Sequence, residues 1–498
     1  MPYPGSGTTF PASSAGSPKH KPVEQKAAFH RSLNLLDGAL LVIGSMIGSG
    51  IFIVSADIAR NVGSAGWLIV VWLLSGFITL AAALSYGELS GMYPKAGGQY
   101  VYLREAYGRM YGFLYGWAFF AVIQTGTIAA VGVAFAKFAG YLVPAVGEGN
   151  VLLGTPGSFH ITAAQFVAIG IIVLLTWLNT LGVKSGKWIQ FFFTFAKIAA
   201  MAALIVFGFL LVKDGSMWAG NWDSAWMAKS ISVTSERISH QGHTAATLMI
   251  AICAAMVGAL FSSDAWNNVT FIAGEIKKPE RNIGLSLFLG TLVVTVIYVS
   301  MNFMYLHVLS VTEIAGAQQD RVALAASLKI FGAAGTTVIA LLVMVSTFGC
   351  NNGLILSGAR VYYTMAHDNL FFKSAGSLNR QGVPAKALWM QCIWASVLCL
   401  SGQYGNLLDF IIFTVLLFYI LTIAGIFVLR KKLPDHPRPY KAFGYPLIPL
   451  VYIVLAAFIC IILLIYKPSY TWPGLIIVLA GIPLFRFLES RSGGSAGA

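Results

Sequence analysis

Charged side chains are scarce in this chain. Asp, Glu, Lys and Arg make up only 10% of its 498 residues, whereas 57% of the residues are hydrophobic. Soluble domains carry roughly 25% charged residues, so the composition excludes a soluble globular protein. In lipid, every backbone amide and carbonyl must be satisfied within the chain, which a helix does by itself. We therefore expect an all-α, polytopic membrane protein.

Cysteine is also rare, and the apolar stretches carry no recognisable catalytic pattern. The five cysteines all lie in apolar spans, where we expect small buried side chains and not a disulfide framework. The spans contain no Ser/His/Asp arrangement, no metal-ligand spacing and no phosphate-binding loop. We therefore do not expect an enzyme, a resident metal or a cofactor.

Long apolar runs occupy most of the chain. A helix needs about 20 mostly apolar residues to cross a bilayer. Twelve runs of about that length are present, and an even number places both termini on the same side of the membrane. The predicted spans are 35–59, 66–90, 111–141, 161–181, 188–212, 244–273, 284–309, 335–360, 385–402, 406–429, 446–466 and 471–487.

Basic residues are unevenly distributed between the segments that connect these spans. If the N-terminus is cytoplasmic, 23 of the 32 Lys and Arg residues fall in inner segments and 7 in outer segments. This bias follows the positive-inside rule, and it accounts for the net charge of +14 without nucleic acid as a partner. We expect a protein of the plasma or inner membrane with both termini in the cytoplasm.

The first apolar span contains the stretch Gly44-Ser45-Met46-Ile47-Gly48-Ser49-Gly50-Ile51-Phe52. Each interior glycine costs a helix roughly 1 kcal/mol, and freed backbone groups in lipid cost several kcal/mol more unless something satisfies them. A break whose backbone groups face a polar ligand is the binding site of many secondary transporters. Helix packing through Gly44-x-x-x-Gly48 is the alternative, and this stretch alone favours neither.

The sixth span is interrupted by polar residues. The run Leu260-Phe261-Ser262-Ser263-Asp264-Ala265-Trp266-Asn267-Asn268 places five polar side chains in the middle of it. A carboxylate at such depth is costly and indicates a functional site. Spans 1–5 and 6–10 then form two halves that each begin with a broken helix. An odd-numbered unit repeated once must be inverted in the membrane, with the site between the repeats.

The two halves and the polar tails give a predicted organisation of the whole chain. It comprises a disordered cytoplasmic N-tail at 1–32, a first five-helix repeat at 33–212, an extracellular loop at 213–243, a second, inverted repeat at 244–430, helices 11 and 12 at 446–487, and a Gly/Ser-rich, disordered cytoplasmic C-tail at 488–498.

Several stretches resemble the amino acid–polyamine–organocation (APC) superfamily of permeases. The stretch 44–52 is similar to the first-helix signature of that superfamily. Two further groups resemble its L-type amino acid transporter branch: Leu260-Phe261 and Trp266-Asn267 followed by Glu275, Pro279, Arg281 and Asn282, and then Ser346-Thr347-Phe348-Gly349 with Asn352-Gly353 and Ser357-x-x-Arg360. The resemblance implies a LeuT-like 5+5 fold with helices 1 and 6 broken. It also implies sodium-independent amino acid transport, often by obligatory exchange.

The resemblance further implies a role for Lys197, which lies deep in span 5. In the L-type branch a lysine at this place stands where sodium-coupled relatives hold a cation. Carried over, Lys197 would bond the carbonyls of the broken first helix and the hydroxyls of Ser346 and Thr347. The alternative is a structural lysine paired with a buried acid.

The expected ligand determines how the two breaks would be used. A zwitterionic amino acid needs amide donors for its carboxylate and carbonyl acceptors for its ammonium. The half-helix that begins near Gly48-Ser49-Gly50 would offer its amides and its positive dipole end to the carboxylate. Free carbonyls around Met46 and Ile47, and around Phe261 and Ser262, would accept from the ammonium.

Three further residues of the sixth span are site candidates. The resemblance makes Phe261 an aromatic gate over the substrate, and Asn267 is expected to orient the unwound segment. Asp264 departs from the commonest pattern of the family, in which small residues precede the Trp-Asn pair. Its possible roles are a counter-ion for a cationic side chain, a protonatable group that couples transport to protons, or a partner for Lys197.

Partners and alternative functions follow from the same comparison. Animal L-type transporters join a glycoprotein heavy chain through a cysteine between spans 3 and 4, and the corresponding stretch 143–160 has no cysteine. We therefore expect a stand-alone, prokaryotic-type carrier. A proton-coupled symporter is the alternative to exchange, and a transporter-like sensor, usually marked by a long regulatory tail, is a further one. A channel would need a continuous polar file, whereas the polar groups here cluster at two breaks.

Overall fold

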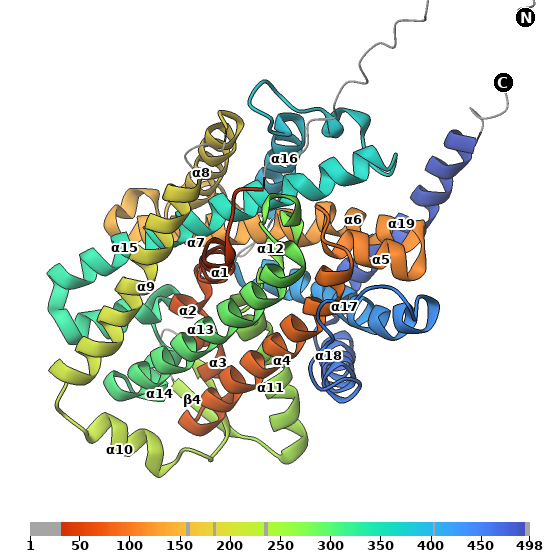
Figure 1. Ribbon diagram of the computed structural model, residues 1–498. Coiled ribbons are helices and arrows are strands. Elements are labelled where there is room, and N and C mark those ends of the chain that lie inside the picture. Colours follow the sequence, from red (N-terminus) through yellow and green to blue (C-terminus); the bar gives the residue numbers. More distant parts are fainter. Residues whose placement is uncertain (1–30, 156–159, 183–185, 234–237, 402–403, 494–498) are drawn as a thin grey trace, which may run out of the picture.

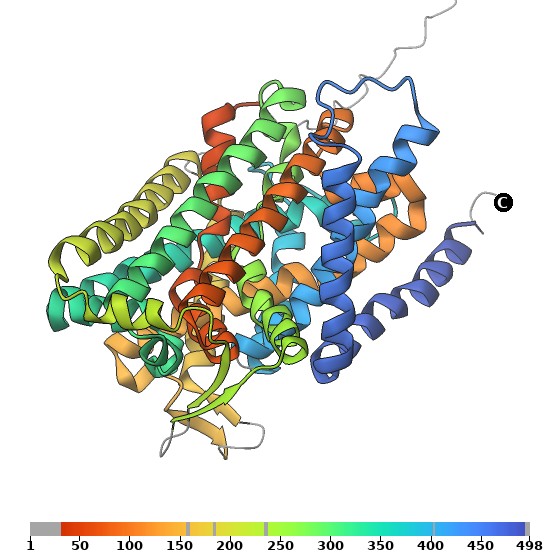
Figure 2. The ribbon, with the colours of Figure 1, turned by 90° about the horizontal axis from the view of Figure 1, so that it is seen from below.

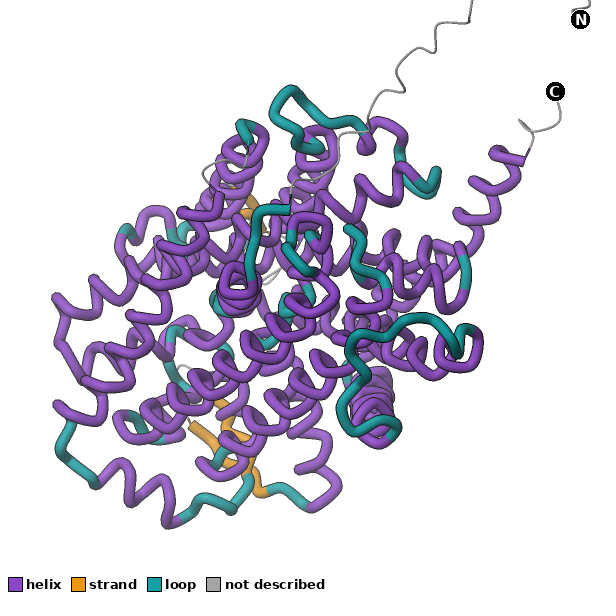
Figure 3. The backbone as a smooth tube through the Cα atoms, viewed as in Figure 1, coloured by secondary structure: helices purple, strands orange, loops and turns teal. Residues whose placement is uncertain are grey.

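The protein consists mainly of long helices (Figures 1 and 3), and Figure 2 shows its two small hairpins at the same end of the molecule. The computed structural model describes residues 31–155, 160–182, 186–233, 238–401 and 404–493. The predicted all-α class is confirmed, because strands within these ranges form only the two antiparallel hairpins. These are β1(Val151–Gly154) with β2(His160–Thr162), and β3(Lys229–Val233) with β4(Ile238–Gly242).

The helices follow one another with short connections. The first half of the chain contains α1(Leu35–Met46), α2(Gly50–Ile53), α3(Ser55–Val62), α4(Ala65–Met92), α5(Gln99–Tyr107), α6(Arg109–Ala118), α7(Gln124–Leu142), α8(Ala163–Thr180), α9(Gly186–Leu211) and α10(Ser216–Asp223). The second half contains α11(Ala245–Ser262), α12(Asn268–Phe271), α13(Pro279–Val308), α14(Val311–Ala315), α15(Val322–His367), α16(Ala385–Ser401), α17(Tyr404–Lys432), α18(Leu447–Tyr466) and α19(Pro468–Gly493). Short 3-10 or π segments connect some of them: η1(Phe119–Ile123), η2(Pro144–Val146), η3(Ala273–Glu275), η4(Gln318–Asp320) and η5(Lys373–Gly376).

Eleven helices in the described part of the chain are long and apolar enough to cross a membrane. The remaining predicted span, the ninth at 385–402, corresponds to the shorter apolar helix Ala385–Leu400. The longest helix, α15, is two helices joined at Gly332, where φ is 71°. A left-handed φ suits glycine because it has no Cβ, and it places the start of the eighth membrane helix just after this residue, close to the predicted position 335.

Helix α1 begins at a capping box. The side chain of Asn34 accepts a hydrogen bond from the Asp37 amide at 2.9 Å, and the Asp37 carboxylate accepts one from the Asn34 amide at 2.9 Å. This arrangement satisfies two of the amides that a helix start leaves free. The preceding residues are held as well, since the amides of Ser32 and Leu33 both donate to the carbonyl of Glu275. The entry to α1 is therefore attached to the segment that follows α12.

Both predicted interruptions are present. The first membrane helix stops at Met46, Ile47 is extended with φ −75° and ψ 90°, and helix resumes at Gly50. Val54 keeps helical dihedral angles, so α2 and α3 continue one another. The second interruption separates α11 from α12, and Ala265 within it has a φ of 63°.

The two interrupted helices lie against each other, and glycines allow the close approach. A Cβ on Gly50 would lie 2.0 Å from the Ser262 hydroxyl oxygen and 2.9 Å from its Cα. A Cβ on Gly258 would lie 2.3 Å from a methyl of Val54. Contact between α2 or α3 and α11 thus requires glycine at both positions, and it brings the two breaks together near the middle of the bundle (Figure 1).

The predictions for the two terminal tails have different outcomes. The predicted N-tail falls almost entirely on residues outside the described ranges. The predicted disordered C-tail is wrong in its boundary, because α19 continues through Gly493 instead of ending at Phe487. The sequence Leu488-Glu489-Ser490-Arg491 contains no helix-breaking residue, so nothing stops the helix where the apolar run ends.

The close approach of α13 to α1 at Gly290 gives a test of how these two helices pack. A Cβ on Gly290 would lie 2.5 Å from a Val42 methyl and 3.3 Å from the Ala39 carbonyl. Overpacking of this kind costs about 1–3 kcal/mol, so Gly290→Leu should clearly lower the melting temperature of the detergent-solubilised protein. Gly170→Leu is the matched control, because Gly170 is exposed and a Cβ there meets nothing within 4 Å. Equal melting temperatures for the two variants would contradict the α1–α13 contact.

Candidate functional site

The first break exposes backbone carbonyls, and a buried cation binds them. The ammonium of Lys197, on α9, donates to the carbonyls of Gly44 at 2.7 Å and Ile47 at 2.8 Å. Lys197 is only 1% exposed. A buried charge is tolerated only with such partners, so the broken helix and the lysine satisfy each other.

Helix α15 contacts the same break from its other side. The Ser346 hydroxyl donates to the carbonyls of Ile47 at 3.4 Å and Gly48 at 3.3 Å, and the Cys350 thiol donates to Ser45 at 3.1 Å. Thr347 instead donates to Val343 and Met344 of its own helix. The predicted bonds from Lys197 to the Ser346 and Thr347 hydroxyls are therefore not formed. A β-branched hydroxyl inside a helix readily bonds its own preceding turn, which explains the difference for Thr347.

At the second break, the Asp264 carboxylate accepts a hydrogen bond from a tyrosine. The Tyr419 hydroxyl, on α17, donates to the Asp264 carboxylate at 2.6 Å. Within the described residues no ion pair joins Asp264 to Lys197, so the predicted role of Asp264 as a partner for Lys197 is wrong. The lysine has its acceptors in the main chain of α1, and the carboxylate has its donor on α17.

Asn267 connects the second break to the short helix α5. Its side-chain amide donates to the Gln99 side-chain carbonyl at 3.2 Å, and the Gln99 amide donates to Thr422 at 3.0 Å. The Asn267 carbonyl accepts from the Thr270 hydroxyl at 2.7 Å. These bonds tie the unwound segment to α5 and to α12, and the orienting role of Asn267 stays a prediction.

Two tyrosines of α13 contact the breaks, and the sequence analysis did not identify them. The Tyr298 hydroxyl lies 3.0 Å from the Met46 carbonyl and 3.1 Å from the Ser262 carbonyl, so it bridges the last residues of α1 and α11. Two turns further along α13, the Tyr305 hydroxyl donates to the Ile51 carbonyl at 3.2 Å. Asn302, between them, accepts from the Ser55 hydroxyl at 2.7 Å. The only sequence signal was their helical spacing, which an aromatic core face shares.

A small cavity lies between the two breaks. It has a volume of about 20 Å³, and its lining includes Met46, Ser49, Gly50, Phe261 and Ser262. A cavity of this size holds about one water molecule. The described conformation is therefore contracted around the site, and an amino acid could enter only after the helices separate.

A second small cavity continues from the first toward α5 and α17. It is also about 20 Å³, and both cavities are lined by Thr127, Asp264, Ala265 and Leu354. Its lining also includes four amide side chains, those of Gln99, Gln124, Asn267 and Asn268. The side-chain nitrogen of Asn268 is buried and has no hydrogen-bond partner within the described part of the chain. Buried amides normally have hydrogen-bond partners, so the Asn268 amide is a donor available to a ligand in this chamber.

Ion pairs close the end of the bundle at which the basic loops gather. Glu88, which is fully buried, accepts from Arg430 at 2.9 and 2.7 Å and lies 3.4 Å from Arg438. Asp368 accepts from Arg104 and from the Tyr100 hydroxyl. The fork of Arg430 on Glu88 is bidentate, the strongest form of such a pair.

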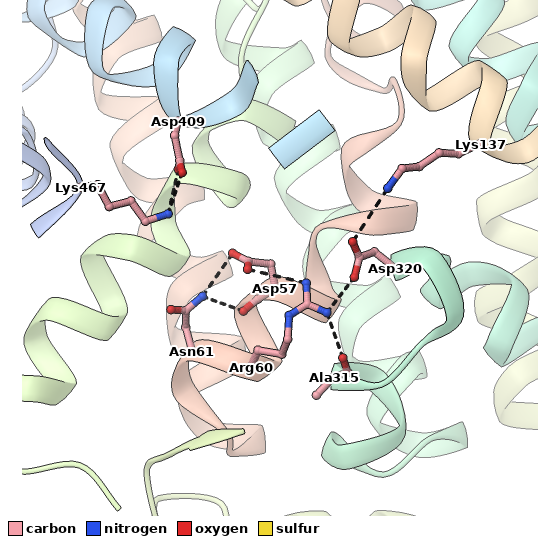
Figure 4. A network of polar contacts seen from close by, with 8 residues as sticks. All are labelled: Asp57, Arg60, Asn61, Lys137, Ala315, Asp320, Asp409 and Lys467. Carbon is pink, nitrogen blue, oxygen red and sulfur yellow. Dashed lines mark hydrogen bonds and ion pairs between the residues drawn. The ribbon is translucent and has the colours of Figure 1, made fainter. Parts of the chain in front are cut away.

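The opposite end carries a second network, drawn in Figure 4. Arg60 of α3 donates to Asp320 at 2.7 Å and to the Ala315 carbonyl at 3.0 Å, and Lys137 of α7 lies 3.9 Å from the same Asp320. Lys467 pairs with Asp409 at 2.9 Å beside it. A cavity of about 390 Å³ lies among these charges. The network attaches the helix after the first break to the loop before α15.

Comparison with known proteins gives these features a context. The amino acid permease family matches residues 33–485. The chain is 30% identical over 465 residues to the serine/threonine exchanger SteT of Bacillus subtilis, covering 93% of this chain and 97% of that one. It is 28% identical over 472 residues to the human b(0,+)-type amino acid transporter 1, covering 93% and 88%. It is also 28% identical over 460 residues to the human large neutral amino acids transporter small subunit 2, covering 92% and 80%. The chain thus belongs to the amino acid permease family of the APC superfamily, and it is a multi-pass membrane transporter and not an enzyme.

Proposed function

We propose that this protein carries amino acids across the cell membrane by alternating access, as a sodium-independent exchanger. The observation that supports this most is the ammonium of Lys197 on the Gly44 and Ile47 carbonyls. Unwound carbonyls at a helix break are the groups that hold coupling ions in secondary transporters. A tethered ammonium at this position removes the need for a free cation.

The backbone of the two breaks would bind the amino and carboxyl groups of the substrate. The amides at Gly48, Ser49 and Gly50 lie at the start of the half-helix α2–α3, whose positive end favours a carboxylate. The carbonyls of Met46 and Ser262 would take the ammonium. Each already accepts from Tyr298, but a carbonyl has two lone pairs and can accept a second bond.

The substrate side chain would extend into the chamber beyond Asp264. Its lining is partly apolar, but the amides of Gln99, Gln124 and Asn268 suit a small polar side chain better than a large apolar one. The relative SteT is a serine/threonine exchanger, which agrees with this preference. For Asp264 two roles are left, a hydrogen-bond or charge partner for the substrate side chain and a protonatable coupling group.

The inverted repeat and the domain boundaries belong to the same proposal. The adjacency of the two breaks supports it, since Gly50 approaches Ser262 closely and a site between repeats is what this architecture produces. With both termini cytoplasmic, the Glu88 and Asp368 ion pairs are the inner closure and the Arg60–Asp320 pair is part of the outer one. Substrate binding at the breaks would bias spans 1, 2, 6 and 7 to rock against 3, 4, 8 and 9.

The carrier would work without a disulfide-linked heavy chain. All five cysteines are buried and free, and a buried thiol deep in a helix bundle cannot reach a partner chain. The hairpin β1–β2 between the third and fourth membrane helices offers Leu152 and Leu153 to its surroundings, not a thiol.

Uptake of labelled amino acids into proteoliposomes tests exchange. We expect uptake only into vesicles preloaded with amino acids, and the rate should be the same with and without sodium or a pH gradient. An exchanger must bind a second substrate to return, whereas a symporter returns empty. Proton-driven uptake into empty vesicles would contradict exchange and favour the symporter. Binding without any uptake would favour the sensor.

Variants of the Asp264–Tyr419 pair separate the two roles of the carboxylate in the same vesicles. Asp264→Asn removes the titratable group, and Tyr419→Phe keeps the carboxylate but removes its hydrogen bond. If Asp264 reads the substrate side chain, Asp264→Asn should change the preference among amino acids and leave the need for preloading intact. If it couples protons, the same variant should abolish any response to a pH gradient.

Replacement of Lys197 tests the surrogate-cation role. Lys197→Ala leaves two buried carbonyls without their donor, each costing about 1–3 kcal/mol, so exchange should fall at least about tenfold while the protein still elutes as a single species. Lys213→Ala is the matched control, because Lys213 follows the same helix and is exposed. Normal exchange by Lys197→Ala would exclude the proposed role.

A further inference from the structure

A groove opens between α6, the end of α15 with the turn that follows it, and α19. Its volume is about 910 Å³, much larger than either cavity at the breaks. Figure 2 shows that α19 leans away from the other helices toward its C-terminal end. The residues of α19 that line the groove, Leu484, Leu488 and Glu489, lie near that end. The groove is separate from the substrate site, and none of the proposed site residues lines it.

The lining of this groove is apolar along most of its length. Phe113, Trp117 and Phe120 contribute from the third membrane helix and its π segment, Phe371 from the turn after α15, and Leu484 from α19. The Trp117 indole is fixed by a hydrogen bond of 2.8 Å to the Ile477 carbonyl of α19. Such a channel between helices in a bilayer suits an acyl chain.

The rim of the groove carries cations with unused donors. Arg109 is exposed and makes one long hydrogen bond to the described residues, 3.3 Å to the Asp368 carbonyl, so most of its five N–H donors are unused there. Lys373 is exposed and has no hydrogen-bond or ion-pair partner among the described residues. Glu489 is the third charged residue of the lining. The rim therefore carries a net positive charge.

The ends of the membrane helices place these features, by inference, at the height of the lipid headgroups. Arg109 is the first residue of α6, Lys373 begins the η5 turn after α15, and Glu489 lies near the end of α19. The three positions lie at the end that carries the Arg104–Asp368 pair, which is the cytoplasmic end by the charge bias. Basic pockets between membrane helices on this side bind acidic headgroups.

We propose that the groove is a binding site for an anionic phospholipid of the inner leaflet. The phosphate lies between Arg109 and Lys373, and one acyl chain follows the aromatic lining toward Leu484. Because Arg109 also donates to Asp368, whose carboxylate belongs to the inner closure, a bound lipid lies next to a closure that must open during transport. The site does not depend on which amino acid is carried or on the mode of transport.

Retention of lipid by the purified full-length protein tests this site. The protein is reconstituted in an equal mixture of phosphatidylglycerol, phosphatidylethanolamine and phosphatidylcholine, extracted in mild detergent, and its retained lipid is counted by native mass spectrometry. We expect phosphatidylglycerol to be enriched. Arg109→Gln combined with Lys373→Gln should lower that enrichment by roughly 10- to 30-fold, the contribution of two basic residues near a membrane surface.

The matched control combines Arg380→Gln with Arg486→Gln, two exposed basic residues that do not line the groove. It removes the same charge and should leave the enrichment unchanged. Equal loss in both double variants would mean a diffuse electrostatic effect and would overturn the site. Retention of all three lipids in the proportion supplied would overturn it as well.

A second measurement keeps Arg109 and Lys373 unchanged, so that misfolding of the double variants cannot account for the result. Brominated phosphatidylglycerol should quench the fluorescence of Trp117 more strongly than brominated phosphatidylcholine, read as the difference between the wild type and Trp117→Phe. Equal quenching by the two lipids would contradict headgroup selection in this groove.

Discussion

The structure depends on a membrane helix that is broken and held open by a buried ammonium. A break in lipid costs several kcal/mol for each backbone group without a partner, and a buried lysine costs as much without acceptors. The hydrogen bonds from Lys197 to the carbonyls of Gly44 and Ile47 offset both free-energy costs, because they give the lysine its acceptors and the carbonyls their donor. The break can therefore persist without a bound ion, and its remaining amides and carbonyls are available to a ligand.

The second break is held by neutral donors, and the two breaks share one. Tyr298 lies within hydrogen-bond distance of Met46 on one side and Ser262 on the other, and glycine at 50 lets the helices meet there. Asp264 and Asn267 are held by α17 and α5. The site is thus assembled from groups that five helices position, namely α5, α9, α13, α15 and α17, and motion between those helices would change its volume. The cavities of about 20 Å³ represent the contracted end of that range.

The sequence was informative where a residue violates the rules of its surroundings. Three features each imply a local free-energy cost: glycines inside an apolar helix, a carboxylate at mid-span and a lysine deep in span 5. The glycines and the carboxylate lie at the breaks, and the lysine contacts the first break. Tyr298 and Tyr305 violate nothing, since an aromatic in an apolar span is ordinary, and their partners are far away in the chain. The pairing of Asp264 with Tyr419 was missed for the same reason: spacing along one helix says nothing about the register against another.

Competition by substrate analogues tests most directly whether the two breaks bind the main-chain groups of an amino acid. The best-transported L-amino acid, its methyl ester and its N-acetyl derivative would be compared as inhibitors of labelled uptake in proteoliposomes. If the amides at Gly48–Gly50 bind the carboxylate and the Met46 and Ser262 carbonyls bind the ammonium, only the unmodified amino acid should compete strongly. Each derivative removes one charge and should be weaker by about tenfold or more, because hydrogen bonds to charged groups contribute about 1.5–3 kcal/mol. Equal competition by either derivative would contradict the account.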